Sequence, residues 1–179
     1  MKRLMGFLWL AGLMLGVGSS GALAATECNG PLSGTIVGGV VVNNGDFCVL
    51  DEANVSGGVQ VNPGGILIVC GSTINGGLDA NGAGNIIVGA EEIDCAGSVI
   101  NGGVHIANTG PGALDGAPSI ALERSVIHGS VHLTGNQGPM AVASNVIAGG
   151  LFCKGNALNV EDEGSPSAVT GKVTCKFAD

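Results

Sequence analysis

The sequence predicts an all-β fold, a single-domain right-handed parallel β-helix (a solenoid) of about seven coils. Three observations lead to this fold class: a short unit that recurs along the chain, an apolar pattern of period two inside it, and a glycine at the same place in every copy. The clearest copy is residues 98–106, SVINGGVHI. The first glycines of the seven copies are Gly38, Gly57, Gly76, Gly102, Gly129, Gly149 and Gly171.

The apolar pattern places a strand at each of these glycines. The residues two positions before and two positions after the glycine are aliphatic in all seven copies. Such alternation is typical of a strand with one buried face. The expected core residues are Ile36, Val55, Ile74, Ile100, Ile127, Ile147 and Val169 before the glycine, and Val40, Val59, Leu78, Val104, Val131, Leu151 and Val173 after it.

A second strand precedes most copies. Apolar residues recur nine and seven positions before the glycine, at Cys48 and Leu50, Leu67 and Val69, Ile120 and Leu122, and Met140 and Val142. One coil cannot bury its apolar row alone, whereas stacked coils bury it continuously. Seven coils stacked at the spacing of paired strands predict a rod of roughly 30–35 Å. Glycine at the coil corners permits the bend that a Cβ would oppose.

The first 24 residues have the pattern of a secretory signal peptide. Lys2 and Arg3 form a charged start, residues 4–17 are apolar, and the sequence Ala22-Leu23-Ala24 fits a cleavage site. The alternative interpretation is that this apolar run is a membrane anchor. We therefore expect a secreted protein, extracellular or periplasmic, with one domain over residues 25–179 and no membrane span after cleavage.

The charge of this mature domain excludes some classes of partner. Residues 25–179 contain four lysines and arginines against fourteen aspartates and glutamates, a net charge of −10. Such acidity opposes binding to nucleic acid or to an anionic membrane surface.

All six cysteines lie in the mature domain, and an even count in an exported chain suggests disulfides. Cys153 and Cys175 occupy the same position in adjacent copies, so they are expected one strand apart and within bonding reach. Pairing of neighbouring coils then predicts Cys28 with Cys48 and Cys70 with Cys95, less directly.

Insertions interrupt the rhythm of the repeat. We expect loops at residues 81–85, 90–97, 107–118 and 161–166, because these stretches are rich in glycine, proline or acidic residues. Loops on a rigid scaffold often carry function, although each can equally be a tolerated surface insertion.

The repeat offers one weak candidate metal site. Asp79, His105 and His132 occupy the same outward position in successive copies, and imidazoles about 5 Å apart could share a divalent metal. The same column holds Gln60 and Thr174, which favours a plain exposed row. No catalytic residues and no cofactor are predicted, because the outward columns offer Asp79 alone and the pairs Asp51/Glu52 and Glu91/Glu92 read as solvated turns.

The recurring V-I-x-G-G-V-x-V pattern, as in residues 99–106 and 146–152, resembles the bactofilins, a family of polymer-forming β-helix proteins. The resemblance covers about residues 35–175 and rests on the period and the corner glycines. It implies a parallel β-helix and assembly end to end. The signal peptide, the six cysteines, the uneven coils and the long insertions depart from that family, and no site residue is carried over.

Two functions are consistent with these patterns. The first is a non-enzymatic exported protein with a structural or adhesive role at the cell surface or envelope, with self-association through the coil ends. The alternative is a carbohydrate-binding or carbohydrate-active β-helix that takes a surface glycan in a groove beside residues 107–118. Carboxylates clustered under that loop would favour the alternative, and a smooth outer face with exposed ends would favour assembly.

Overall fold

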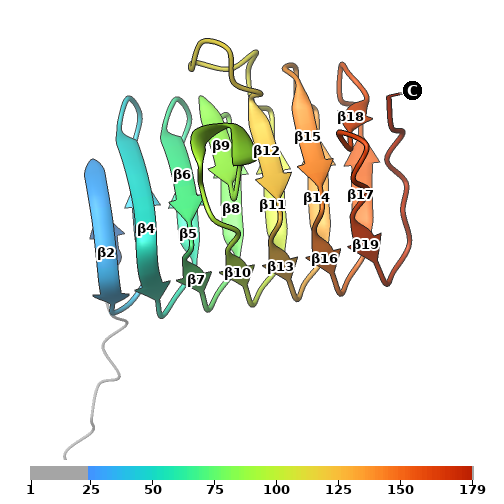
Figure 1. Cartoon of the computed structure of the whole chain (residues 1–179). Coiled ribbons are helices and arrows are strands. Elements are labelled where there is room, and N and C mark those ends of the chain that lie inside the picture. The colour runs from blue at the N-terminus through green and yellow to red at the C-terminus, as the bar shows by residue number, and fades with distance from the viewer. Residues whose placement is uncertain (1–23, 179) are drawn as a thin grey trace, which may run out of the picture.

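The computed structural model describes residues 24–178, and in this part of the chain the fold is all-β apart from one short 3-10 turn, η1 (Glu91–Ile93). The strands form two sheets that curl around a common core in a β-helix-like arrangement (Figure 1). The seven-stranded sheet contains, in spatial order, β1 (Thr26–Glu27), β3 (Val40–Val42), β5 (Val59–Val61), β8 (Leu78–Asn81), β11 (Val104–Ala107), β14 (Val131–Thr134) and β17 (Leu151–Lys154).

The twelve-stranded sheet divides into two arms at β4 (Phe47–Val55), a strand long enough to pair with β6 and β7 at once. One arm continues from β6 (Ile66–Cys70) through β9 (Asn85–Val88), β12 (Ile120–Glu123) and β15 (Met140–Ala143) to β18 (Val160–Glu161). The other continues from β7 (Thr73–Ile74) through β10 (Val99–Ile100), β13 (Val126–Ile127) and β16 (Val146–Ile147) to β19 (Ala168–Val169). On the other side of β4 lies β2 (Gly30–Ile36).

Pairing between the named strands is parallel throughout, and partners come from successive copies of the repeat. Val104 pairs with Leu78 on one side and with Val131 on the other, in agreement with the alignment on glycine. The first glycines stack in the same way. Each donates its N–H to the carbonyl of the previous one, from Gly57 to Gly38 at 2.7 Å through to Gly171 to Gly149 at 3.0 Å.

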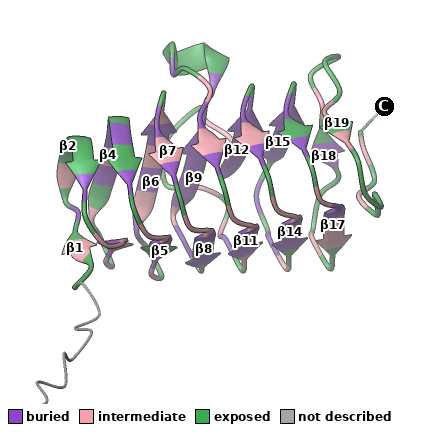
Figure 2. Cartoon of the chain, turned by 90° about the horizontal axis from the view of Figure 1, so that it is seen from below, coloured by how far each residue is buried: buried purple, intermediate pink, exposed green. Residues whose placement is uncertain are grey.

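The core lies between the sheets and is built from the predicted aliphatic rows (Figure 2). Twelve of the fourteen residues two positions from the first glycines are buried. The two exceptions belong to the last copy, where Val169 is half-buried and Val173 is 44% exposed. They are less buried because no further described strand covers this end.

The predicted loop at residues 81–85 is only partly correct. Asn81 ends β8 and Asn85 begins β9, so the turn between them is residues 82–84. The second strand of this copy was missed because residues 89–97 separate it from Gly102, so Ile86 and Val88 lie farther from the glycine than their counterparts do.

Three disulfides join the cysteines in the pairs expected from the repeat: Cys28–Cys48, Cys70–Cys95 and Cys153–Cys175. Each links residues 20 to 25 positions apart in sequence. Three disulfides in a small domain are typical of an oxidising environment, extracellular or periplasmic. The predicted signal peptide, residues 1–24, falls outside the described residues apart from Ala24. Within residues 24–178, no helix has the length and apolar character needed to cross a membrane.

Candidate functional site

The row that holds the candidate metal ligands lies on the outer face of the seven-stranded sheet. Asp79 pairs in register with His105, and His105 with His132, so the three are neighbours as expected. The two imidazole rings meet edge to face, with centroids 4.7 Å apart. His132 also stacks on Phe152, with centroids 4.8 Å apart. In residues 24–178, grouped ligand atoms of the kind that hold a metal are found at three glutamates and not in this row.

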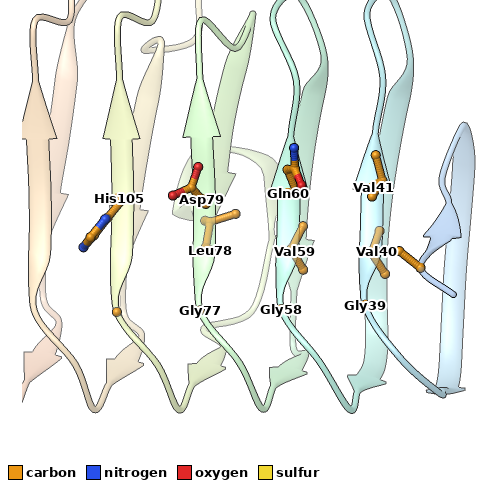
Figure 3. Close-up of a pocket in the computed structure, with 12 residues that line it drawn as sticks. Gly39, Val40, Val41, Gly58, Val59, Gln60, Gly77, Leu78, Asp79 and His105 are labelled. Carbon is orange, nitrogen blue, oxygen red and sulfur yellow. The ribbon is translucent and has the colours of Figure 1, made fainter. Parts of the chain in front are cut away.

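A shallow hollow of about 480 Å³ runs beside the N-terminal part of this row (Figure 3). Its floor is formed by Gly39, Gly58 and Gly77, and Gln60 and Asp79 stand along its side. These glycines keep the floor low because the strands allow no side chain there. A Cβ on Gly58 would lie 3.0 Å from the carbonyl oxygen of Gly77, and one on Gly39 would lie 2.9 Å from that of Gly58. The hollow is thus a consequence of tight coil stacking.

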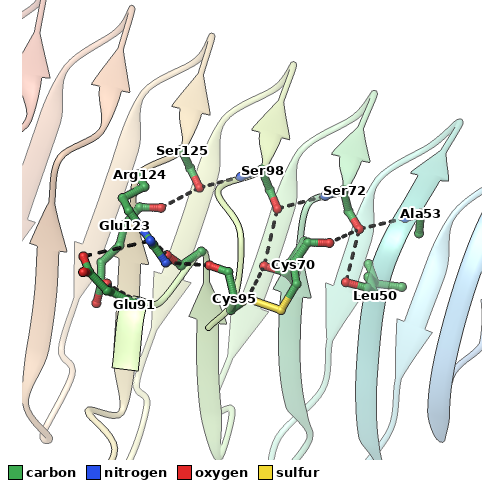
Figure 4. The surroundings of a disulfide bond; sticks show 12 residues. Leu50, Ala53, Cys70, Ser72, Glu91, Cys95, Ser98, Glu123, Arg124 and Ser125 are labelled. Atoms are coloured by element: carbon green, nitrogen blue, oxygen red, sulfur yellow. Dashed lines mark hydrogen bonds and ion pairs between the residues drawn. A yellow bond between two sulfur atoms is a disulfide. The ribbon is translucent and has the colours of Figure 1, made fainter. Parts of the chain in front are cut away.

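A ladder of buried polar side chains runs along the inside of the other sheet, and sequence reasoning missed it (Figure 4). In each step a backbone N–H donates to a side-chain oxygen of the next coil. The steps run from Ala53 to Ser72 at 2.9 Å, Ser72 to Ser98 at 3.1 Å, Ser98 to Ser125 at 2.9 Å, Ser125 to Asn145 at 3.0 Å and Asn145 to Ser167 at 3.1 Å. The signal was present in the sequence, because each acceptor stands four positions before a first glycine.

A second ladder of side-chain hydrogen bonds lies on the surface and includes His128, the third histidine. Asn75 donates to the Oδ1 atom of Asn54 at 2.9 Å, and Asn101 donates to that of Asn75 at 3.0 Å. The Nδ1 atom of His128 lies 2.8 Å from Oδ1 of Asn101 and ends this run. His128 therefore belongs to a structural ladder and stands apart from the other two histidines.

The carboxylates differ from the sequence-based interpretation. Glu92, Glu123 and Glu163 bring one carboxylate oxygen each within 4.8 Å of one another. Glu91 and Glu92 are exposed on the short turn η1, as expected, but Glu92 also belongs to this cluster. Asp79 is also not the only carboxylate on the outer faces, because Glu123, the last residue of β12, shares the outer face of that strand with Ala121. Its position was readable from the alternation, but the loops that bury it were not.

The loop at residues 107–118 borders a hollow of about 350 Å³ close to these carboxylates. Gly116, Ala117 and Pro118 line one side, and Glu161 and Glu163 line another. The loop also covers part of the sheet. Leu114 and Ala117 pack on a small outer cluster of Ile87, Ala90 and Ala121.

A comparison with models of known protein families found no match, and comparisons with curated proteins and with solved structures found none either. The parallel sheets agree with the fold that the resemblance to bactofilins implies, but no relative supports membership of that family. Inference about function therefore rests on the geometry of this chain.

Proposed function

We propose that the protein is an exported, non-enzymatic structural element, a right-handed parallel β-helix of about seven coils that acts as a rod at the cell surface or in the envelope. Parallel strand crossovers are almost always right-handed, which supports the handedness. The polar side chains offer further support, because two ladders of hydrogen-bonded side chains connect one coil to the next.

The observation that supports end-to-end assembly is the distribution of charge between the two ends of the β-helix. Of the four basic residues in the described part of the chain, three are exposed near the C-terminal end of the β-helix: Lys154 ends β17, the last strand of the seven-stranded sheet, and Lys172 and Lys176 lie in the last copy of the repeat. At the other end, the edge strand β1 carries the exposed Glu27. A copy added head to tail would bring these opposite charges together, and opposite charges favour encounter and register. Such contacts are heterologous and extend into filaments unless they close.

The backbone at the first edge is also available for pairing. Thr26 and Cys28 donate their N–H groups inward, to Gly39 and Val41. Because alternate residues of a parallel strand bond to opposite neighbours, the N–H and C=O of Glu27 face the free edge. An unpaired edge is a template for another strand.

Light scattering after size exclusion of the oxidised mature protein, across a concentration series, tests the proposal. We expect species larger than a monomer at high concentration and a shift toward monomer in high salt. Glu27→Pro removes the outward N–H while sparing the inward bonds of β1, so it should shift the series toward monomer, as should the charge reversal Lys172→Glu. Asp115→Lys, in a loop away from both ends, is the control. A strict monomer at every concentration would exclude end-to-end assembly.

A second candidate function is glycan binding at the hollow beside residues 107–118. The observation that favours it is the presence of Glu161 and Glu163 across from this loop, because carboxylates can accept hydrogen bonds from sugar hydroxyl groups. The lining contains no aromatic platform for a sugar ring. Calorimetric titration with acidic and neutral oligosaccharides tests it, and a Glu163→Gln variant that binds a sugar as well as the native protein would count against this site.

A further inference from the structure

The three clustered glutamates come from segments far apart in sequence. Glu92 lies on η1, within the segment that leaves β9 and crosses the outer face of the twelve-stranded sheet (Figure 1). Glu123 is the last residue of β12, and Glu163 lies in the turn after β18. The residue between Glu123 and the turn that carries Glu163 is small. Ala143 pairs in register with Glu123 and forms a bridge with Pro166, and its side chain is only a methyl group.

Glu123 is buried, and its carboxylate is only half satisfied. The residue is 2% exposed. Its Oε2 atom accepts a hydrogen bond from the N–H of Glu91 at 3.0 Å. Its Oε1 atom has no hydrogen-bond partner in the described part of the chain. A buried carboxylate oxygen without a donor is costly unless a cation or a proton compensates it. This orphan oxygen belongs to the carboxylate that enters the cluster.

The nearby Arg124 binds backbone carbonyls and not the clustered glutamates. Arg124 donates from Nε to the carbonyl of Gly89 at 3.1 Å and from Nη2 to that of Cys95 at 2.8 Å (Figure 4). Its Nη1 atom lies 3.9 Å from a carboxylate oxygen of Glu91, at the exposed side of η1. Arg124 therefore anchors residues 89–97 to β12. The structure gives it no hydrogen bond or ion pair with Glu123 or Glu163.

We propose that Glu92, Glu123 and Glu163 form a calcium site that ties residues 89–97 and the turn after β18 to β12. Two oxygens bound to one calcium ion at about 2.4 Å can lie up to about 4.8 Å apart, which the three carboxylate oxygens satisfy. The ligand set is all oxygen and carries no soft atom, so it suits a hard cation. Magnesium fits less well because it requires bonds of about 2.1 Å in near-octahedral geometry.

The charges around the cluster add to the attraction for a cation. Besides its three members, Glu91 on η1 and Glu161 at the end of β18 are negative, and Arg124 is the single basic residue in contact with η1 in the described part of the chain. Burial raises the pKa of the Glu123 carboxyl, and the neighbouring Glu92 raises it further. The pKa of Glu163 is raised as well, by partial desolvation and by the charges of Glu123 and Glu92. Without a cation, then, the carboxylates of the cluster repel one another, and a bound calcium ion would relieve that repulsion.

Calcium titration of the whole mature protein, freed of metal with EDTA and kept at constant ionic strength at pH 7, tests this assignment. Calorimetry should give a saturable signal with one site per chain and a dissociation constant on the order of 10⁻⁴–10⁻³ M, as in extracellular modules. The melting temperature should rise by roughly 3–6 °C at twentyfold excess over that constant. Magnesium at the same concentration should produce less than half of the rise.

Variants identify the ligands. Glu163→Gln alters an exposed ligand with little risk to folding and should weaken calcium binding at least tenfold. Glu123→Gln can still accept the N–H of Glu91 and should abolish the response. Glu161→Gln removes the same charge from a neighbour outside the cluster, and we expect less than a threefold change. An equal response of the Glu163 and Glu161 variants, an equal response to magnesium, or no saturable binding of calcium would each overturn the site.

Discussion

The column of first glycines makes a sharp stability prediction, for which Gly102→Ala is the test. A Cβ on Gly102 would lie 2.6 Å from the nitrogen of Gly77 and 2.7 Å from the carbonyl carbon and oxygen of Gly76. All three are backbone atoms of the preceding turn, which cannot rotate away as a side chain can. The φ angle of Gly102 is not positive, so steric contact is the whole effect.

The magnitude follows from the displacement that the methyl group forces. An ordinary contact starts at 3.4 Å, so the two turns must separate by about 0.8 Å. That separation weakens the hydrogen bond from Gly102 to Gly76, now 2.9 Å long, and adds overpacking strain. The two effects together amount to about 3 kcal/mol of unfolding free energy. The melting temperature should fall by about 6–12 °C.

Substitutions at two other glycines, Gly110 and Gly116, distinguish the steric effect at Gly102 from backbone strain. A Cβ added to Gly110 would have no heavy atom within 4 Å, and the φ of this residue is not positive, so Gly110→Ala should change stability by less than about 0.5 kcal/mol. Gly116 also has open space but a φ of +77°, so Gly116→Ala should cost about 1 kcal/mol. Urea unfolding followed by circular dichroism gives the three values. Equal stability of the Gly102 and Gly110 variants would refute the reasoning.

Three further predictions concern the bonds between coils and the titration of the glutamates. Replacing both Cys153 and Cys175 with serine should lower the unfolding free energy by about 3 kcal/mol, measured by urea unfolding, because a closed loop of 22 residues is released. Ser98→Ala removes the oxygen that accepts the buried N–H of Ser72 and should cost about 1–2 kcal/mol in the same assay, whereas Ser33→Ala on the exposed part of β2 should cost almost nothing. In EDTA, the unfolding free energy should fall as the pH rises above 4.5, the ordinary pKa of a glutamate carboxyl group. The reason is that the pKa values of Glu123 and Glu163 are raised in the folded state, so their ionisation is less favourable in the folded than in the unfolded protein. Melting curves from pH 4 to 8 should show a smaller fall when both are changed to glutamine, and a pH-independent difference between the two proteins would contradict the assigned pKa directions.

Much of the fold was predictable because the repeat encodes it locally. Aliphatic residues two positions on either side of Gly102 indicated the buried positions correctly, although the structure places them on two strands, β10 and β11, with Gly102 at the corner between the two sheets. Recurrence of the unit specifies what each strand pairs with. The Cys153–Cys175 disulfide followed for the same reason, since these two cysteines hold equivalent positions and stacking brings equivalent positions together. The buried ladder through Ser98 was equally regular in the sequence, four positions before each first glycine, and was overlooked only because serine there resembles a turn residue.

The exceptions arise where the copies are interrupted. Residues 89–97 displaced the second strand of one copy, so β9 was missed. The path of such an insertion is set by contacts that have no period, such as the bonds of Arg124 to the carbonyls of Gly89 and Cys95. No spacing rule relates an arginine just after a strand to two carbonyls about 30 residues earlier.

The sequence by itself therefore determined the parallel strands, the core rows, the glycine column and the Cys153–Cys175 disulfide, because each of these depends on equivalent positions in successive copies. Only the tertiary structure decided the meeting of Glu92, Glu123 and Glu163. Their positions in the chain bear no relation to the repeat, and they converge because two loops fold back over one outer face and the methyl group of Ala143 leaves space between them. Repetition makes stacking readable from the sequence, whereas convergence of unrelated segments depends on three-dimensional packing alone.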